Sequence, residues 1–489
     1  MINRLIQRFT TFQFVGFSVL LLISIFIGIY TGYYVLAGIV PFLLFIYITL
    51  AEFELIYFLL MAMIPLSVEV TLPGGFGTDL PTEPIMVGLM LVFFSFVMSN
   101  PKQFNKNFFQ HPLVLFLAAH IFWMCFCVIY SVKLEVSVKY MLAKFWYVTT
   151  FCFMSGLVVT SLKKFRTVFW GITITLFFTV IWTLIRHAQH GFSFASVNTM
   201  MAPFFRNHVN YAAILAMMLP FIWCAIHWYN RGTFKRRFLY LAGVVFIVGV
   251  ALSYTRGAWL ACFACLGCYM LIRYKLLTWL LAAGFVGVFV LIGYLVHKNN
   301  YLNYAPNYQN TIMHENFEDH LKATTEMEDI SSEERVYRWV AAFHMFVKSP
   351  WVGYGPGNFY NFYKSHTVNS FRTYVSDNPE RSTVHNYFLL MLTEQGIFGL
   401  AFFFALTFAI FFYGQHIYHQ TKNKDEQRWV MAILLCMVAI YIQTFLSDLL
   451  EVDKIGSFYF MNIALLINQD LRNRGLLHTA DKPGNIINK

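Results

Sequence analysis

Three arginines occupy positions where a guanidinium group needs either a partner or an anionic ligand. Arg256 lies in a short polar stretch, residues 253–259, between two long apolar runs, and Arg335 and Arg338 share a later polar segment. A charge enclosed by apolar runs costs several kcal/mol unless it is paired, reaches the membrane surface or lines a watery cavity. Because guanidinium donates two parallel hydrogen bonds to phosphate, all three arginines fit a phosphate ligand. The competing interpretations are a headgroup anchor for Arg256 and solvated loop arginines for the other two.

One histidine is placed where proton transfer would be useful. His385 closes the polar segment, directly before a long apolar run. Imidazole accepts and donates protons readily near neutral pH, so His385 is a candidate general base. The alternative is a helix-end histidine bonded to the backbone. His208, in another polar link, is the second candidate for the base. His208 and Arg206 of the same link are both expected to contact substrate.

Other groups of polar residues are better explained without chemistry. Gly353, Gly355 and Gly357 surround Pro356 and predict a turn rather than a phosphate-binding loop. The acidic stretch 315–329 has no regular metal-ligand spacing, and the eight cysteines all lie in apolar runs. We therefore expect no metal and no cofactor.

The composition shows which kind of scaffold must hold these residues. The 489-residue chain is 58% hydrophobic and 12% charged, with a mean hydropathy of +0.58. These values indicate an all-α polytopic membrane protein. Fourteen apolar runs approach spanning length, or twelve if short runs are re-entrant: 12–30, 33–50, 54–70, 84–98, 112–130, 138–159, 167–185, 209–227, 238–254, 257–272, 276–296, 385–412, 429–448 and 455–468.

Lys and Arg are concentrated in every second link between these runs, which predicts cytoplasmic links and cytoplasmic termini. The net charge of +11 is thus mainly an orientation signal, and no nucleic-acid partner is expected. The long polar segment 297–384 then faces outward, on the same side as Arg206, Arg256 and His385. The expected regions are 1–205, 206–296, 297–384, 385–470 and a cytoplasmic tail, 471–489.

The outward segment is expected to contain one amphipathic helix. Ser331 and Glu334 have the spacing of a capping box. An apolar stripe follows at helical spacing: Val336, Trp339, Val340, Phe343, Phe346 and Val347. Arg335 borders this stripe and Arg338 is turned further from it, so a helix lying on the membrane would hold Arg335 at headgroup level.

Together these segments resemble the O-antigen ligase family, over roughly residues 205–415. Three motifs carry the likeness: residues 253–258 (SYTRGA); residues 334–339 (ERVYRW) followed by Pro350, Gly353 and residues 355–359 (GPGNF); and residues 385–387 (HNY) followed by residues 394–396 (EQG). The family has about twelve spans. The resemblance implies that Arg256 and Arg335 hold a lipid diphosphate and that His385 serves the acceptor. Arg338 and Arg206 have no secure counterpart in the family.

The resemblance implies a glycosyltransferase in the bacterial cytoplasmic membrane, acting on its outer, periplasmic side. Its donor would be a glycan on undecaprenyl diphosphate, and its acceptor a hydroxyl of a lipid A-core sugar. One displacement with His385 as base predicts inversion at the anomeric carbon without a metal. The alternatives are a polysaccharide polymerase, a protein O-oligosaccharyltransferase and, from another class, a solute transporter.

Overall fold

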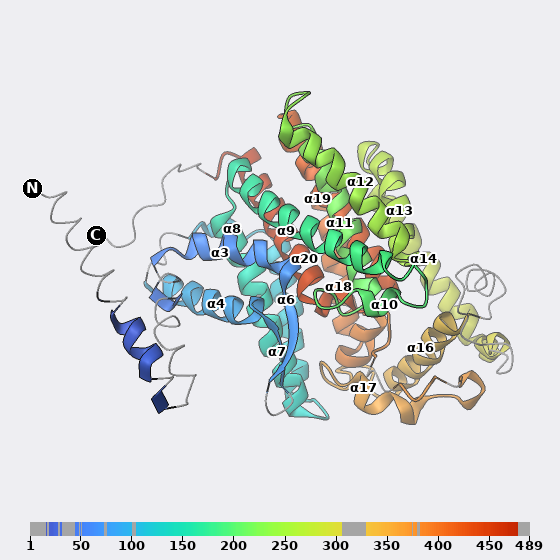
Figure 1. Cartoon of the computed structure of the whole chain (residues 1–489). Coiled ribbons are helices and arrows are strands. Elements are labelled where there is room, and N and C mark those ends of the chain that lie inside the picture. The colour runs from blue at the N-terminus through green and yellow to red at the C-terminus, as the bar shows by residue number, and fades with distance from the viewer. Residues whose placement is uncertain are drawn as a thin grey trace, which may run out of the picture.

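The computed structural model describes residues 16, 19–27, 30–31, 45–47, 49, 51–72, 76–99, 104–305, 329–373, 375–378 and 382–477. Among these residues, eight helices are long and apolar enough to cross a membrane. The predicted all-α polytopic fold is confirmed (Figure 1). The apolar runs 12–30 and 33–50 lie largely outside the described residues, so the expected twelve to fourteen spans stay a prediction.

Most of the predicted runs coincide with a described helix. The N-terminal half contains α3 (Phe53–Met63), α4 (Thr82–Ser99), α5 (Lys106–Phe109), α6 (Pro112–Ile129), α7 (Leu134–Val148), the π-helical turn η4 (Thr149–Met154), α8 (Ser155–Val158), α9 (Leu162–Ala188), α10 (Val197–Met200) and α11 (His208–Ile226). The remainder contains α12 (Phe234–Leu252), α13 (Arg256–Arg273), α14 (Leu277–Val296), α16 (Ile330–Lys348), α17 (Phe359–Phe362), α18 (Tyr387–Gln420), α19 (Lys424–Leu446) and α20 (Asp453–Asn473). Short 3₁₀ segments are η2 (Ile64–Leu66), η5 (His297–Tyr304), η6 (Tyr363–His366), η7 (Asn369–Phe371) and η8 (Leu449–Glu451).

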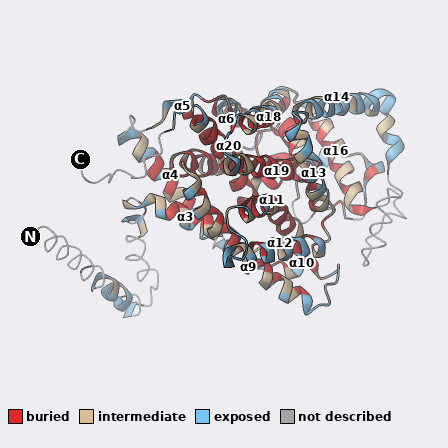
Figure 2. Ribbon diagram, turned by 90° about the horizontal axis from the view of Figure 1, so that it is seen from above, coloured by how far each residue is buried: buried red, intermediate tan, exposed pale blue. Residues whose placement is uncertain are grey.

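The centre of the bundle is formed by α11, α19 and α20, whose side chains are mostly buried (Figure 2). α11 packs against α12 and α19, and α19 also packs against α13, α18 and α20. α14, in contrast, exposes most of its side chains. An apolar helix with exposed apolar side chains is expected where lipid is the solvent.

The predicted run 54–70 is wrong at its end, because the helical part stops at η2 and a β-hairpin follows. β1 (Val68–Leu72) pairs antiparallel with β2 (Phe76–Leu80), with Val70 opposite Thr78. The hairpin is fixed to the start of α20. Lys454 Nζ donates to the carbonyls of Ile64 (2.8 Å) and Ser67 (3.0 Å), and Asp453 accepts a hydrogen bond from the Ser67 hydroxyl at 2.8 Å.

The glycine turn at residues 353–357 packs against a break in α18. Gly396 has φ +69°, and its neighbours' backbone groups bond to the turn instead of to the helix. Tyr354 N–H donates to Thr393 O (3.0 Å), Gly355 N–H to Glu394 O (2.9 Å), and Ile397 N–H to Pro350 O (2.8 Å). A Cβ on Gly396 would overlap the Trp351 carbonyl. Such irregular backbone survives at membrane depth because it is buried in protein.

Glu394 completes this junction from a buried position at the break in α18. Its carboxylate accepts hydrogen bonds from the backbone N–H groups of Gly357 (2.7 Å) and Phe359 (2.9 Å). The junction holds the start of α17 against α18, and α16 also packs along α18. The polar segment that carries α16 and α17 is thereby attached to a helix that begins two residues after His385.

Replacing Glu394 with alanine is expected to destabilise the protein by about 2–4 kcal/mol, because two buried N–H groups lose their acceptor. The measurement is thermal unfolding of the purified protein in detergent. Gln420→Ala, at the exposed end of the same helix, is the matched control and should leave Tm unchanged. Equal Tm values for both variants would mean that the junction does not depend on the carboxylate.

Candidate active site

The predicted site residues meet at one end of the helix bundle. His208 begins α11, Arg256 begins α13 and His385 precedes α18. The tight turn between α12 and α13 occupies only residues 253–255, as the sequence predicts. Thr255 Oγ1 donates to the His208 carbonyl at 3.3 Å, which joins the starts of α11 and α13. The four elements α11, α13, α16 and α18 therefore position the polar groups.

Arg256 forms an ion pair with the acidic residue that caps the start of α16. Its Nη2 lies 2.7 Å from Asp329 Oδ2. Asp329 is the N-cap of α16, and the same oxygen accepts the backbone N–H of Ser332 at 3.1 Å and its hydroxyl at 2.7 Å. The predicted capping box of Ser331 and Glu334 is therefore wrong. Asp329 both starts α16 and ties it to α13.

Arg338 is more deeply buried than its place in the sequence suggests. It is 6% exposed, and its Nη2 lies 3.2 Å from Glu334 Oε2. The other Glu334 oxygen accepts the hydroxyls of Thr373 and Ser376. Arg338 does lie away from the apolar stripe of α16, but that side of the helix is the one buried against the protein.

The buried face of α16 carries polar and charged residues rather than the apolar stripe. Its buried residues are Ile330, Glu333, Glu334, Tyr337, Arg338, Ala341, Ala342 and Met345. The predicted stripe is only half-buried along most of its length, and Val347 is 71% exposed. α16 therefore turns its charged side toward the protein.

Arg335 differs from its two neighbours because its side chain has no hydrogen bond or ion pair to any described residue. Its Nε is buried. Burial and the nearby charges of Arg256 and Arg338 together lower the pKa of Arg335 to about 10, although the charge of Asp329 opposes this shift. The guanidinium is still charged at neutral pH. Two paired arginines thus flank one cation that has hydrogen-bonding capacity to spare.

His385 lies beside these arginines and near a carboxylate that the sequence analysis did not select. Its Nδ1 is 3.9 Å from Asp448 Oδ1, beyond direct hydrogen-bond distance. Burial and the charges of Arg338 and Arg335 lower the pKa of His385 to about 3. The imidazole is therefore neutral at physiological pH, as a proton acceptor must be. Its backbone φ of +53° marks a left-handed turn directly before α18.

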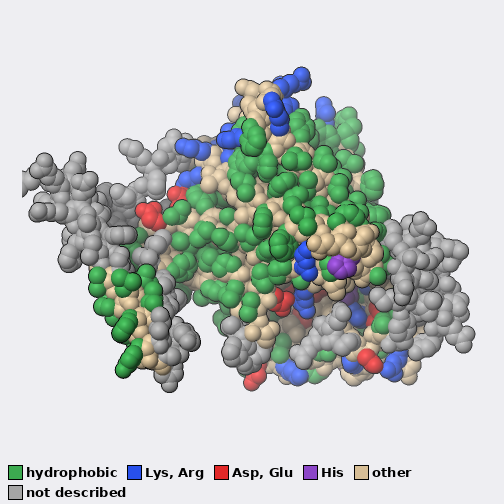
Figure 3. All heavy atoms as spheres, in the orientation of Figure 1, with side chains coloured by type: hydrophobic (Ala, Val, Ile, Leu, Met, Phe, Trp, Pro, Cys, Tyr) green, Lys and Arg blue, Asp and Glu red, His purple; other side chains and the backbone are tan. Residues whose placement is uncertain are grey.

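Asp448 follows α19. It is the last residue of the predicted apolar run 429–448, so its position in the sequence did not mark it as a site residue. Burial raises the pKa of its carboxyl group, and the charge of Arg206 opposes that rise. Arg206 is exposed and acts on Asp448 through its charge alone. Figure 3 shows basic and acidic side chains around a recess between the apolar body and the layer that carries α16 and α17.

Comparison with protein families identifies the segment that carries this geometry. Residues 241–404 match the family model described as O-antigen ligase. The chain contains an O-antigen ligase domain. The matched segment includes Arg256, Arg335, Arg338 and His385, whereas Asp448 and Arg206 lie outside it. No curated protein sequence matches the chain.

The match over residues 241–404 supports a glycosyltransferase of the ligase or polymerase type. Together with the eight helices of spanning length among the described residues, the match supports a multi-pass bacterial membrane protein that acts on lipid-linked glycans.

One predicted site residue, His208, has a hydrogen-bond partner of its own. The His208 imidazole Nδ1 bonds to Asn198 Oδ1 at 2.5 Å, so this nitrogen is occupied. Among the described residues, no group of three or more His, Cys, Asp or Glu side chains has a geometry suited to a metal ion. Glu315, Glu318 and Asp319, the acidic residues most able to bind a cation, lie outside the described residues.

Proposed function

We propose that the protein transfers a glycan from undecaprenyl diphosphate to an acceptor hydroxyl, a lipid A-core sugar, at the outer face of the cytoplasmic membrane. The observation that carries this proposal is the Arg335 guanidinium, which has no partner among the described residues and lies near Arg256, Arg338 and the neutral His385. A guanidinium without an acidic partner suits an anionic group supplied by a substrate, and a diphosphate presents the required pairs of oxygens.

The proposed reaction is one displacement. The acceptor oxygen bonds to the anomeric carbon, and the bond from that carbon to the diphosphate oxygen breaks, so the electron pair leaves with the diphosphate. The acceptor proton moves to His385 Nε2, because Nδ1 faces Asp448. Asp448 then offsets the charge of the imidazolium, and the arginines offset the charge that grows on the diphosphate. Attack opposite the leaving group inverts the anomeric carbon, and the arginines do the work that a divalent ion does in other enzymes.

The distribution of charge supports a periplasmic active site. The links rich in Lys and Arg, such as residues 231–237 before α12, lie at the end of the molecule opposite to α16 and α17 (Figures 1 and 3). Basic links stay in the cytoplasm. The proposed orientation therefore has cytoplasmic termini and an outward-facing recess.

The pH dependence of the proposed reaction has a specific sign. His385 is active when neutral, so activity is lost as the pH falls through its pKa. The free protein holds this pKa at about 3 through burial, Arg338 and Arg335, and Asp448 is the facing carboxylate. Bound diphosphate offsets the positive charges of the two arginines and therefore raises the pKa of His385. We expect kcat to fall at a higher pH than kcat/KM does.

This expectation is checked by pH profiles of purified protein between pH 4 and pH 9. The acid limb of kcat/KM should lie well below 6.5, the ordinary pKa of histidine. Limbs at the same pH for both parameters, or a kcat limb below that of kcat/KM, would contradict the proposed charge balance.

A cell-based experiment tests the proposed function and its closest alternative. Removing a ligase should leave long polymers attached to undecaprenyl diphosphate and leave the lipid A-core without them. Removing a polymerase of the same family should leave single repeat units on the lipid. Accumulation of neither species would overturn both assignments and favour another acceptor, such as a protein, or a transported solute.

A further inference from the structure

A second polar cluster is built on residues that closely follow His385 and Asp448 in the sequence, and the proposed reaction does not use it. Glu451, in η8, accepts hydrogen bonds through Oε1 from the hydroxyls of Tyr140 (2.6 Å) and Tyr387 (2.7 Å). Lys144 Nζ lies 2.8 Å from Oε1 and 2.9 Å from Oε2. One carboxylate thus joins α7, α18 and η8.

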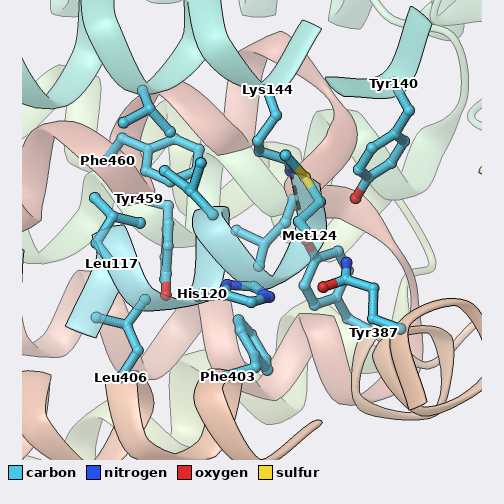
Figure 4. A pocket seen from close by; sticks show the side chains of 14 residues that line it. Leu117, His120, Met124, Tyr140, Lys144, Tyr387, Phe403, Leu406, Tyr459 and Phe460 are labelled. Carbon is cyan, nitrogen blue, oxygen red and sulfur yellow. Dashed lines mark hydrogen bonds between the residues drawn. The ribbon is translucent and has the colours of Figure 1, made fainter. Parts of the chain in front are cut away.

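The surroundings of this cluster are apolar. Lys144 is one of the residues that line a pocket between α6, α7, α18 and α20, with Tyr140 and Tyr387 on the same border (Figure 4). The ammonium group lies 5.2 Å from the Tyr140 ring centroid, 5.8 Å from that of Phe460 and 5.9 Å from that of Tyr387. The Lys144 side chain is only 11% exposed. A charge pair in such a place is held tightly, because separating the partners would leave a buried charge uncompensated.

The cluster is connected to the proposed site through two short pieces of chain. Tyr387 follows His385 by two residues, and Glu451 follows Asp448 by three. His385 and Asp448 themselves are 3.9 Å apart, so no direct hydrogen bond fixes their separation. Their relative placement must come from the segments that carry them. The Tyr387–Glu451 hydrogen bond joins those two segments.

We propose that Tyr387, Glu451 and Lys144 are positioning residues that set the distance and orientation between His385 and Asp448. The inference rests on the proposed role of His385 as the base. The cluster contacts neither donor nor acceptor in this account; it acts by locking the start of α18 to η8. Loosening it should leave substrate binding nearly intact and should lower the rate of the proton-transfer step.

Tyr387→Phe tests the proposal without changing charge or volume appreciably. We expect kcat to fall about tenfold, because small displacements of a catalytic group are costly, while KM changes by less than about twofold. The pKa of His385, followed by NMR of ¹³C-labelled histidine and assigned with His385→Gln, should rise toward its ordinary value of about 6.5 as the ring becomes better hydrated. The acid limb of kcat should move in the same direction.

Tyr441→Phe is the matched control. It removes another buried hydroxyl, which bonds to the Tyr459 hydroxyl at 3.0 Å and does not touch Glu451. This variant should leave kcat and the pKa of His385 unchanged. A Tyr387→Phe variant that behaves like the control, or that loses rate while the pKa of His385 stays fixed, would refute positioning.

A double variant guards against misfolding. Lys144→Met combined with Glu451→Gln removes both charges together, so neither is left uncompensated. It should change kcat and the pKa of His385 in the same direction as Tyr387→Phe, and an unchanged pKa in this folded double variant would overturn the proposal. The NMR readout does not depend on transfer. If His385→Ala kept normal transfer, the role of His385 as the base would fail, while the pKa of His385 in the Tyr387→Phe variant would still report whether the cluster positions the ring.

Discussion

Replacing His385 with alanine is expected to lower kcat for glycan transfer by about 10²–10⁴-fold, the range that a positioned general base contributes. Its neutral imidazole lies beside Arg335 and Arg338, with Asp448 facing Nδ1. Alanine offers no acceptor for the proton of the attacking hydroxyl. The measurement is turnover by purified protein with a lipid-linked glycan and an acceptor.

The control for this prediction is His227→Ala. His227 is exposed at the far end of α11, where its ring bonds to the Trp223 carbonyl. Both variants should be expressed and inserted like the parent protein. If His385→Ala kept near-normal turnover, the general base would be another residue, and His208 would be tested next.

Replacing Arg335 with lysine is expected to lower kcat by about 10²–10³-fold, as loss of a donor to the developing negative charge does in other enzymes. Lysine keeps the positive charge but loses the planar pair of donors that matches two phosphate oxygens. Arg256→Lys should also lower turnover. It should in addition loosen α16, because Arg256 bonds to the N-cap Asp329.

Arg372→Lys is the matched control in the same polar segment, residues 297–384. Arg372 pairs with Asp377, and both side chains are more than half exposed, so this surface pair should contribute little. Normal turnover in both the Arg335 and Arg256 lysine variants would mean that these arginines contribute to packing and membrane topology but not to catalysis. A loss confined to KM would instead indicate binding without preferential stabilisation of the transition state.

The helices could be predicted from the sequence because spanning segments must be long and apolar. The runs from 84–98 onward each coincide with a helical segment, whereas the hairpin of β1 and β2 was missed. Its strands are short, and the alternation in Val68–Leu72 is too brief to stand out beside an apolar helix.

The candidate site was predicted in part, and the missing residues share a cause. Arg256, Arg335, Arg338 and His385 stand out because charge and imidazole are rare near apolar runs. Their partners Asp329 and Asp448 are ordinary acidic residues whose significance appears only when distant segments meet.

The face of α16 was misjudged for a related reason. Helical periodicity was used to find the buried face, on the assumption that burial selects apolar residues. In α16 the charged side of the helix faces the protein, and the apolar side is the less buried one.

The central claim is that this site moves a glycan from a lipid diphosphate by means of His385 and the arginines. It is tested most directly by purified protein in liposomes containing a glycan on undecaprenyl diphosphate and a lipid A-core acceptor, with EDTA present. The account predicts that free undecaprenyl diphosphate appears in equal amount to the new glycosidic bond, that the anomeric configuration is inverted, and that His385→Ala forms neither product. Transfer that requires a divalent ion, or that retains the configuration, would contradict it.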